Sequence, residues 1–446
     1  MQMQAANKHV VVGLGKTGLA CARHLHRQNI PFVGVDTRSE PPGIAEFRQE
    51  FPDVHTECGE LRAETLCSAQ TLVMSPGVDL RTSAVQKAIA SGVNITGDID
   101  LFAKLAPAPL VAISGSNAKS TVVTLVGEMA KEAGLRTAVA GNIGKPVLDL
   151  LTEEPYELYV LELSSFQLET TFNLNAAVAT VLNMSPDHMD RYDSMQAYHR
   201  AKHRIFQGCR HVVINRDDAL TRPLLPATVK VTSFGLGPEE SRDFSVIQQQ
   251  GKQYLAYARQ PLLAVAELKI AGQHNVANAL AALALGQAVG LQWEPMLAAL
   301  RSFPGLPHRC QWVATIDGVP WYNDSKGTNV GASVAAITGL GSTGKVLLLA
   351  GGVGKGAKFT ELGPVMSRFG KLAILFGEDA DKIAVVLSGS VPVQRAGSLQ
   401  EAVEQARTLA RPGDLVLLSP ACASFDMFNN YEHRGQVFMD TVRALH

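Results

Sequence analysis

Short runs of β-branched and other apolar residues alternate with helical patterns along most of the chain, and no other feature restricts its fold as strongly. The runs include HVVVGLG, TLVMSPG, LVAISG, YVLELSS, AVATVLN, HVVIN, KVLLLAGG, KLAILFG and DLVLLSP. Strands separated by helices form parallel sheets, because a parallel neighbour is reached only through a crossover connection. Runs that are almost entirely apolar, such as VATVL at residues 178–182, suit strands covered on both faces. The sequence therefore predicts an α/β fold.

The chain is too long for a single domain. Its 446 residues are about three times the common domain length. Prolines interrupt the pattern at Pro107 and Pro109, and again in the stretch PGLP at residues 304–307. We therefore predict three domains, at residues 1–97, 98–305 and 306–446. Between about residues 226 and 270 the pattern weakens, which indicates a small antiparallel insertion in the second domain.

Composition and charge exclude several classes of protein. The formal net charge is -1, so the chain has no basic field that would attract nucleic acid. Six cysteines lack CxxC spacing, which argues against zinc or a disulfide framework and favours a reducing compartment. No apolar run approaches the roughly 18 residues of a membrane-spanning helix, and the first residues do not resemble a signal peptide. We expect a cytoplasmic protein without membrane insertion.

The stretch GLGKTG at residues 13–18 has the glycine spacing GxGxxG directly after a strand run, and Asp36 ends the next run. Glycines let backbone amides approach a pyrophosphate, while the carboxylate can accept from a sugar hydroxyl or a base N–H. A tight turn without a ligand would need similar glycines, but the two parts together favour nucleotide binding. Arg38 and residues 75–77 fall in the same crevice, so a diphosphate sugar nucleotide fits as well as NAD.

The stretch ISGSNAKSTVVTL at residues 113–125 has the order of a phosphate-binding loop, a strand followed by a turn and a helix. A Walker A loop would have glycine where this chain has Ile113 and Ala118. A left-handed backbone at Ala118 would cost on the order of 1 kcal/mol, which is tolerable. Backbone amides of residues 115–120 could then hold phosphates, with Lys119 as the cation and Ser120 on magnesium. An ordinary helix start is the alternative.

Two further segments could complete a phosphoryl-transfer site. Glu162 ends the strand run YVLEL, and the loop NMSPDHMDRY holds Asp187, His188 and Asp190. These carboxylates and the imidazole could bind metal ions, although His188 could equally cap its own loop. Lys202 lies on the next helical pattern, and by default it is a surface lysine.

A long Ala- and Leu-rich helical pattern begins with QHNVANALAA. Its Asn275 and Asn278 share one helix face, since they lie three residues apart. They could reach an adenine base or merely cap the helix.

Seven motifs in sequence order resemble those of the bacterial Mur ligases. They are GSNAKST, ELSSFQLE, LNMSPDHMDRY, AGQHNVANALAA, GLPHRCQW, YNDSKGTN and SPACASFDMFNNYEHRG. The likeness extends from GLGKTG to the last helical pattern, and it is greatest to the members that add D-glutamate.

The resemblance implies an N-terminal Rossmann-like domain for a UDP-sugar, a central P-loop-type ATPase domain and a C-terminal Rossmann-like domain for an amino acid. It implies a monomeric ligase that uses ATP and Mg²⁺ to join D-glutamate to UDP-N-acetylmuramoyl-L-alanine through an acyl phosphate, in peptidoglycan precursor synthesis. A carboxylate is a poor electrophile, so a phosphoryl group must first activate it.

The resemblance also implies roles for individual residues. Lys119, His188 and Lys202 are implied as catalytic, with Lys202 carbamylated, and the metal ligands are Ser120, Glu162, His188 and Lys202. The ATP-binding residues are Gly115, Ser116, Asn117, Ala118, Lys119, Ser120, Thr121, Asn275, Asn278, Arg309 and Asp324. The UDP-substrate-binding residues are Gly15, Thr17, Asp36, Thr37, Arg38, Ser75, Gly77 and Asn142. The D-glutamate-binding residues are Thr328, Lys355, Ser424, Phe425 and Tyr431.

Two places depart from the family pattern. Where the family commonly reads GGDGKGADF, this chain reads GGVGKGAKF, so that Val353 and Lys358 replace acids. Lys358 would add a cation near the amino acid or point to solvent. Tyr431 stands where many relatives have phenylalanine.

Three other functions remain possible at this point. An NAD-dependent oxidoreductase would explain GLGKTG with Asp36 but would leave the phosphate loop without a role. A ligase for another amino acid, or of the folylpolyglutamate type, would share that loop and the carbamylated lysine. A binding protein without catalysis would explain Ala118 and Val353.

Overall fold

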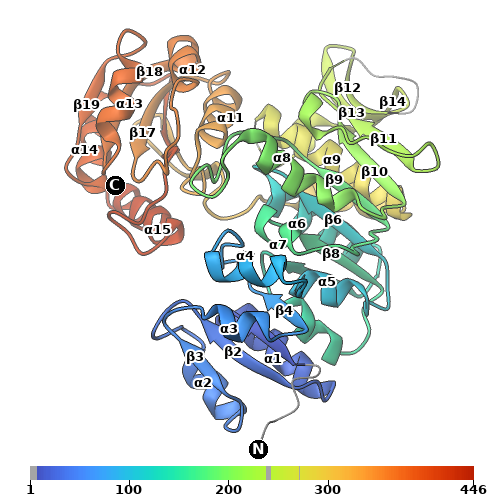
Figure 1. Ribbon diagram of the computed structural model, residues 1–446. Coiled ribbons are helices and arrows are strands. Elements are labelled where there is room, and N and C mark those ends of the chain that lie inside the picture. The colour runs from blue at the N-terminus through green and yellow to red at the C-terminus, as the bar shows by residue number, and fades with distance from the viewer. Residues whose placement is uncertain (1–7, 238–242, 271, 446) are drawn as a thin grey trace, which may run out of the picture.

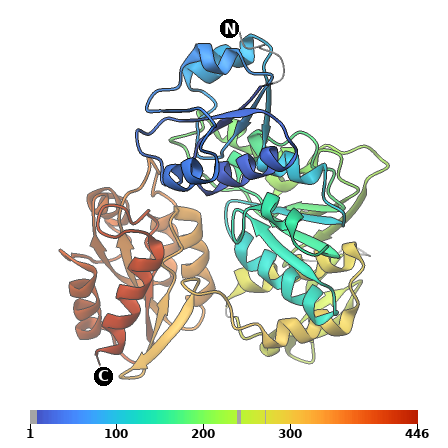
Figure 2. The same cartoon turned by 90° about the horizontal axis from the view of Figure 1, so that it is seen from below.

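The computed structural model describes residues 8–237, 243–270 and 272–445. This part of the chain forms three lobes in sequence order, each built around one β-sheet (Figure 1). The view from below shows the lobes grouped around a common centre rather than in a row (Figure 2).

The N-terminal lobe has a five-stranded parallel sheet in the order β3-β2-β1-β4-β5. Its β1 is buried at Val10, Val11 and Val12, as expected for a strand covered on both faces. The elements are β1 His9–Val12, α1 Lys16–Arg27, β2 Phe32–Asp36, α2 Ile44–Glu50, β3 Thr56–Cys58, α3 Ala63–Cys67, β4 Thr71–Met74, α4 Ser83–Ala90 and β5 Asn94–Gly97.

The central lobe has a nine-stranded sheet in the order β14-β13-β12-β11-β10-β9-β6-β8-β7. On one of its faces α6 packs against α9 and α10. Its first elements are α5 Asp98–Ala103, β6 Leu110–Ser114, α6 Lys119–Glu132, β7 Thr137–Gly141, η1 Val147–Thr152, β8 Leu158–Glu162, α7 Ser165–Glu169, β9 Val178–Val181 and α8 Met195–His203. The others are η2 Arg204–Phe206, β10 His211–Asn215, η3 Ala219–Thr221, β11 Lys230–Phe234, β12 Phe244–Gln249, β13 Lys252–Tyr257, β14 Gln260–Ala264, η4 Val265–Glu267, α9 Gln273–Val289 and α10 Trp293–Ser302.

The C-terminal lobe has a six-stranded sheet in the order β15-β16-β20-β17-β18-β19, parallel except for the first pair. Its elements are β15 Gln311–Ile316, β16 Val319–Asn323, α11 Val330–Leu340, β17 Lys345–Gly351, α12 Leu362–Phe369, β18 Gly370–Phe376, α13 Ala380–Leu387, β19 Val393–Arg395, α14 Leu399–Leu409, β20 Asp414–Leu418 and α15 Tyr431–Arg443.

The predicted antiparallel insertion is present, because β12, β13 and β14 pair antiparallel at one edge of the central sheet. Over the described residues, no helix is long and apolar enough to cross a membrane. The boundaries near residues 98 and 306 stay a prediction, although each lobe has its own sheet on either side of them. The first seven residues, on which the signal-peptide argument rests, lie outside the described part.

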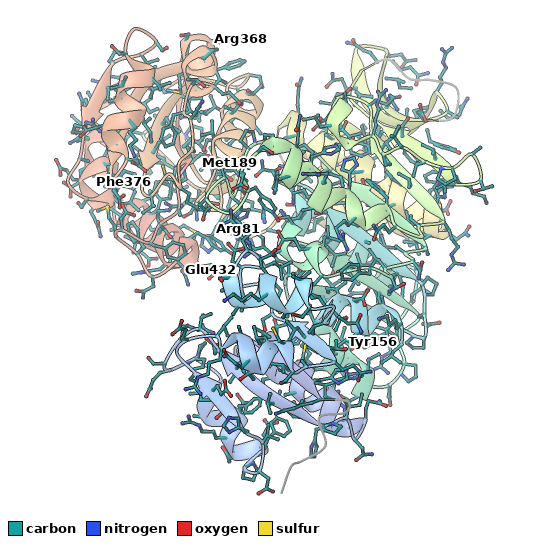
Figure 3. The ribbon with its side chains drawn as sticks, in the orientation of Figure 1. Arg81, Tyr156, Met189, Arg368, Phe376 and Glu432 are labelled. Atoms are coloured by element: carbon teal, nitrogen blue, oxygen red, sulfur yellow. The ribbon has the colours of Figure 1, made fainter. Side chains whose placement is uncertain are left out.

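Ion pairs join the N-terminal lobe to the loop after β9. The guanidinium of Arg81 pairs with Asp193 at 3.1 Å, and that of Arg191 donates to the carbonyl oxygen of Val78 at 3.2 Å. Figure 3 labels Arg81 and Met189 in the region where the three lobes approach one another. The same loop carries His188, so its position depends on both lobes.

Candidate active site

The turn between β6 and α6 has the backbone that the sequence predicted for a phosphate loop. Ala118 lies in the left-handed region at φ 67°, and the helix begins at Lys119. Gly115 also has a positive φ, and a Cβ there would lie 3.1 Å from the Cβ of Leu182. Alanine in place of glycine at position 118 therefore strains the backbone of this turn but does not change its path.

Only part of the loop backbone is available to an anion. The amides of Ser116 and Asn117 donate to the main-chain and side-chain oxygens of Asn183 at 2.9 and 2.8 Å. This differs from the expected nest of six amides, because Asn183 ties the loop to the segment after β9. In the described structure, the backbone amides of Ala118, Lys119 and Ser120 donate no hydrogen bond to another residue. They form the first turn of α6, which is the favoured place for a phosphate.

Two lysines, the half-buried Lys119 and the buried Lys202, share one acceptor in this loop. Nζ of Lys119 and Nζ of Lys202 donate to the carbonyl oxygen of Gly115 at 2.8 and 2.9 Å. Lys202 is only 2% exposed, so the default reading of a surface lysine is wrong. Burial lowers the pKa of Lys202 well below its usual value, and the charge of Lys119 lowers it further. The site therefore favours an uncharged amine at Lys202.

Glu162 has one carboxylate oxygen free for a cation. Its Oε1 accepts from Nδ2 of Asn142 at 2.9 Å. Its Oε2 is buried and has no hydrogen-bond partner in the described structure. Ser120 Oγ lies close by in the same cavity and accepts from Arg309 at 2.9 Å. A buried, unpaired carboxylate oxygen fits a bound metal ion.

The described residues contain no cluster of three or more His, Cys, Asp or Glu side chains that could hold a metal by themselves. Such a sparse set suits Mg²⁺, which is commonly held by one or two carboxylates together with water and substrate phosphates.

His188 is held in a strained loop. Its φ is 56°, and Nε2 lies 3.7 Å from the carboxylate of Asp187. Its ring meets the edge of Phe166 at a centroid distance of 4.8 Å. Burial lowers the pKa of His188, which keeps the imidazole neutral and able to bind a metal.

One cavity of about 390 Å³ is lined by residues from each predicted group: the catalytic, metal-binding, ATP-binding, UDP-substrate-binding and D-glutamate-binding residues. Its walls come from the phosphate loop, from β8 and the loop after β9, and from the C-terminal lobe. The predicted residues that line it are Ser116, Asn117, Ala118, Lys119, Ser120, Asn142, Glu162, His188, Lys202, Arg309, Thr328, Lys355, Ser424, Phe425 and Tyr431. The cations among them outnumber the acids, so the cavity suits anionic ligands.

A neighbouring cavity of about 280 Å³ is lined by the predicted ATP residues Thr121, Asn275, Asn278 and Asp324, and it shares Asn117, Ala118 and Arg309 with the larger cavity. Phe234 and Leu182 add apolar surface that suits a flat base. Burial raises the pKa of Asp324 to about 6, and its carboxylate accepts from Ser419 at 2.7 Å.

Sequence reasoning missed two residues of the site, although both lie in the quoted motif YNDSKGTN. The side chain of Asn329 donates to Asn117 Oδ1 at 3.1 Å and to Asp187 Oδ2 at 3.2 Å. Lys326 lines both cavities, and burial with the nearby charge of Arg309 lowers its pKa to about 8. The motif was a signal for these residues, but only the packing of the lobes gives them their partners.

The predicted UDP-substrate residues lie apart from these cavities, with the exception of Asn142. Both oxygens of Asp36 are occupied by Arg38, through its backbone N–H and its guanidinium, and by the N–H of Leu14 at 2.7 Å. A carboxylate has about four acceptor sites, so Asp36 orients Arg38 rather than facing a ligand as expected. Gly15 has an ordinary φ of -92° and open space beside it, so local packing does not require glycine there.

The other predicted UDP-substrate residues lie around the carboxyl ends of β1, β2 and β4. They are Thr17, Thr37, Ser75 and Gly77. Ser75 donates to the carbonyl oxygen of Gly13 at 2.9 Å, which holds the glycine turn against the end of β4.

Sequence profiles of one family match the chain in three successive segments. They are described as Mur ligase MurD-like, N-terminal domain, at residues 7–97, Mur ligase middle domain, at residues 113–286, and Mur ligase, glutamate ligase domain, at residues 308–422. A UDP-N-acetylmuramoylalanine--D-glutamate ligase of Pseudomonas aeruginosa is 59% identical over 438 residues, covering 98% of both chains. The chain belongs to the Mur ligase family.

A second relative of this Mur ligase is the UDP-N-acetylmuramoylalanine--D-glutamate ligase of Pseudomonas fluorescens. It is 58% identical over 439 residues, which cover 98% of both chains. Among solved structures, a pseudomurein peptide ligase type C from Methanothermus fervidus aligns with a TM-score of 0.63 at 17% identity, over 99% of this chain and 100% of that one. That identity supports the fold alone. The α/β fold and the family resemblance are confirmed, while the roles of individual residues stay predictions.

The loop that departs from the family pattern adjoins the 390 Å³ cavity of this Mur ligase. Val353 exchanges backbone hydrogen bonds with Ala423, the neighbour of Ser424. Lys355 follows with a positive φ of 50° and lines the cavity. Lys358 is exposed and lines an adjoining hollow of about 510 Å³, which shares Thr328 and Lys355 with the cavity. Val353 is therefore joined through its backbone to the segment of the predicted D-glutamate residues, whereas Lys358 lines the hollow beside their cavity.

Proposed function

We propose that this Mur ligase joins D-glutamate to UDP-N-acetylmuramoyl-L-alanine at the expense of ATP, in the synthesis of peptidoglycan precursors. The relatives named above carry that activity in their names and match nearly the whole chain. The observation that carries the proposal is the single cavity of about 390 Å³, which joins a phosphate loop to residues of the C-terminal lobe. A phosphoryl donor and an amine can meet there.

The charges of the cavity suit phosphoryl transfer to a carboxylate. When bound, ATP supplies the phosphoryl group that turns the acceptor carboxylate into an acyl phosphate, which the amine of D-glutamate then displaces. Lys119 belongs to the phosphate loop, and Arg309 donates to Ser120 of that loop. Both line the cavity, where they would offset the repulsion between the phosphates and the anionic acceptor. The amides of the first turn of α6 would orient the phosphates.

Magnesium would be held by Glu162 through its unpaired oxygen, with Ser120 and His188 as further ligands. It would supply charge neutralisation between phosphate and carboxylate oxygens. Lys202 would join it as a carbamate. A carbamate would form when the uncharged amine adds to dissolved CO₂ and releases one proton, and the burial of Lys202 beside Lys119 favours the uncharged amine. The carbamate would then present an anion to Lys119 and to the metal.

The two other substrates would reach this cavity from different lobes. Lys355 and Ser424, from the C-terminal lobe, would hold the carboxylates of D-glutamate, with Thr328, Phe425 and Tyr431 around them. Arg38 and the GLGKTG turn would hold the diphosphate of the UDP-substrate, and Asn142 would lie near its reacting end. We assign these roles to domains at residues 1–97, 98–305 and 306–446 of a monomer that acts in the cytoplasm, where both nucleotides are available.

The test is phosphate release from ATP in the presence of UDP-N-acetylmuramoyl-L-alanine and a panel of amino acids that includes both enantiomers of glutamate. We expect release and a new amide product, identified by mass spectrometry, with D-glutamate alone. A product with L-glutamate or another amino acid, or no product with any, would overturn the proposed specificity. The Lys119→Ala variant serves as the control for contaminating phosphatases.

A further inference from the structure

Helix α8 carries two pairs of side chains spaced four residues apart, and only one pair faces the 390 Å³ cavity. Tyr198 and Lys202 line that cavity. His199 directly follows Tyr198, and His203 directly follows Lys202. The histidine side chains are therefore rotated by about 100° around the helix axis relative to the pair that lines the cavity. Both histidines are half-buried, and His199 lines a separate hollow together with Leu220. The histidine pair therefore belongs to no part of the proposed ligase site.

Both imidazole rings point to the same oxygen atom. Nε2 of His203 lies 2.8 Å and Nε2 of His199 lies 3.0 Å from the carbonyl oxygen of Leu220. The two rings stack at a centroid distance of 3.7 Å and an interplanar angle of 29°. Leu220 belongs to η3, so two nitrogens from α8 and one oxygen from a separate segment converge.

The spacing of these atoms matches the coordination shell of a metal ion. Ligand atoms that lie about 2.1 Å from one ion are about 3.0 Å apart when their bonds meet at a right angle, as in the square-planar or tetragonal shells of Cu²⁺ and Ni²⁺. The two Nε2···O distances have that length, which is also that of an N–H···O hydrogen bond, so an ion would replace these two hydrogen bonds. Histidines at i and i+4 on one helix are a recurrent pair of metal ligands, as in the HExxH motif. Water can occupy the remaining positions, because the rings are partly open to solvent.

We propose that His199, His203 and the carbonyl oxygen of Leu220 form a site for a divalent transition-metal ion that prefers imidazole, namely Cu²⁺ or Ni²⁺. Imidazole nitrogen suits these ions and not Mg²⁺, which prefers oxygen. The site is thus chemically distinct from the proposed magnesium site, although both involve α8.

The oxygen ligand is held in place by its own surroundings. Oδ1 of Asp218 accepts from the N–H of Leu220 at 3.0 Å, while Oδ2 accepts from the N–H of Met184 at 2.7 Å. Thr221 donates to the carbonyl oxygen of Asn215 at 3.1 Å. A ligand fixed in this way loses little freedom when an ion binds. The bound ion would clamp η3 to the helix that carries Lys202.

The test uses Cu²⁺ as the probe on the full chain after treatment with a chelator. Equilibrium dialysis measures uptake, and electron paramagnetic resonance detects nitrogen ligands of the bound copper. We expect the wild type to bind one tight equivalent with two nitrogen ligands. His199→Gln and His203→Gln should each lose it. Glutamine can still donate to the carbonyl oxygen of Leu220, and the melting temperature without metal shows whether each variant folds.

Two matched variants separate this site from other histidines. His188→Gln removes the imidazole of the proposed magnesium site, and His55→Gln removes an exposed histidine beside Glu57. Both should keep the tight equivalent. Ni²⁺ should raise the melting temperature of the wild type and not that of the His199→Gln, His203→Gln double variant. Unchanged copper uptake by the double variant, or loss of uptake in His188→Gln alone, would overturn the proposal.

Discussion

The Asn329→Asp substitution tests whether contacts between the lobes hold the phosphate loop and the metal loop together. The side chain of Asn329 has two separable roles. Its Oδ1 accepts from the N–H of Ala332 and caps α11, whereas its Nδ2 donates to Asn117 and Asp187 of the central lobe. Aspartate caps a helix as well as asparagine does, so the substitution keeps the first role. It removes the second.

The substitution should raise the free energy of the arrangement in which the central and C-terminal lobes are in contact. Losing two hydrogen bonds costs about 2 kcal/mol in total, at roughly 1 kcal/mol each. The new carboxylate oxygen would also lie close to Oδ2 of Asp187, which is 3.2 Å from Nδ2 of Asn329. At that distance two unit charges repel by up to about 5 kcal/mol at an effective dielectric constant near 20. The lobes can separate to relieve this repulsion, so the closed arrangement is lost before the fold is.

We expect kcat/KM for ATP-dependent phosphate release to fall at least about thirtyfold, which corresponds to about 2 kcal/mol. Small-angle X-ray scattering with all ligands present should show a larger radius of gyration than for the wild type. The melting temperature should stay close to that of the wild type. Asn329→Ser is the matched control, because serine keeps the cap but lacks both the amide NH₂ of asparagine and the charge of aspartate, so its loss should be smaller. Wild-type kcat/KM in Asn329→Asp would refute the reasoning.

Three further substitutions test other parts of the site. Lys119→Ala should lower phosphate release by on the order of a hundredfold or more, while calorimetry shows nearly unchanged binding of the UDP-substrate; an equal loss of both would contradict separate sites. Val353→Asp should leave ATP binding unchanged and alter mainly the KM for D-glutamate, and if every kinetic constant stays the same, this loop lies outside the working site. Lys202→Ala should lose nearly all ligase activity and regain part of it with a small carboxylic acid, since the acid can replace a carbamate; rescue by small amines instead would show that the site uses a positive charge.

The local pattern of the sequence predicted most of the fold. Apolar runs between helical patterns were sufficient for parallel sheets, because a strand buried on both faces needs apolar residues throughout. The phosphate loop was also predictable from its strand, turn and helix, despite Ile113 and Ala118. The cost assigned to Ala118 matches its left-handed backbone, since the turn imposes that conformation whichever residue stands there. These features depend on neighbours within a few positions of the chain.

Features that depend on distant contacts were not predictable in the same way. Lys202 could be read as a surface lysine because its helix has polar residues on several sides, yet packing against the phosphate loop buries it. Asp36 is a different case, because Arg38 lies only two residues away: the nucleotide-binding pattern does not show that Arg38 and Leu14 take its four acceptor sites.

The sequence by itself determined the order of strands and helices, the course of the phosphate loop and the family to which the chain belongs, because these follow from local chemistry and motif order. The tertiary structure alone decided that Asn329 bridges Asn117 and Asp187, and that one oxygen of Glu162 stays unpaired in a buried cavity. These contacts join residues far apart in the chain. Which polar atoms meet, and which remain without a partner, is therefore set by how the lobes pack, and no periodicity along the chain records it.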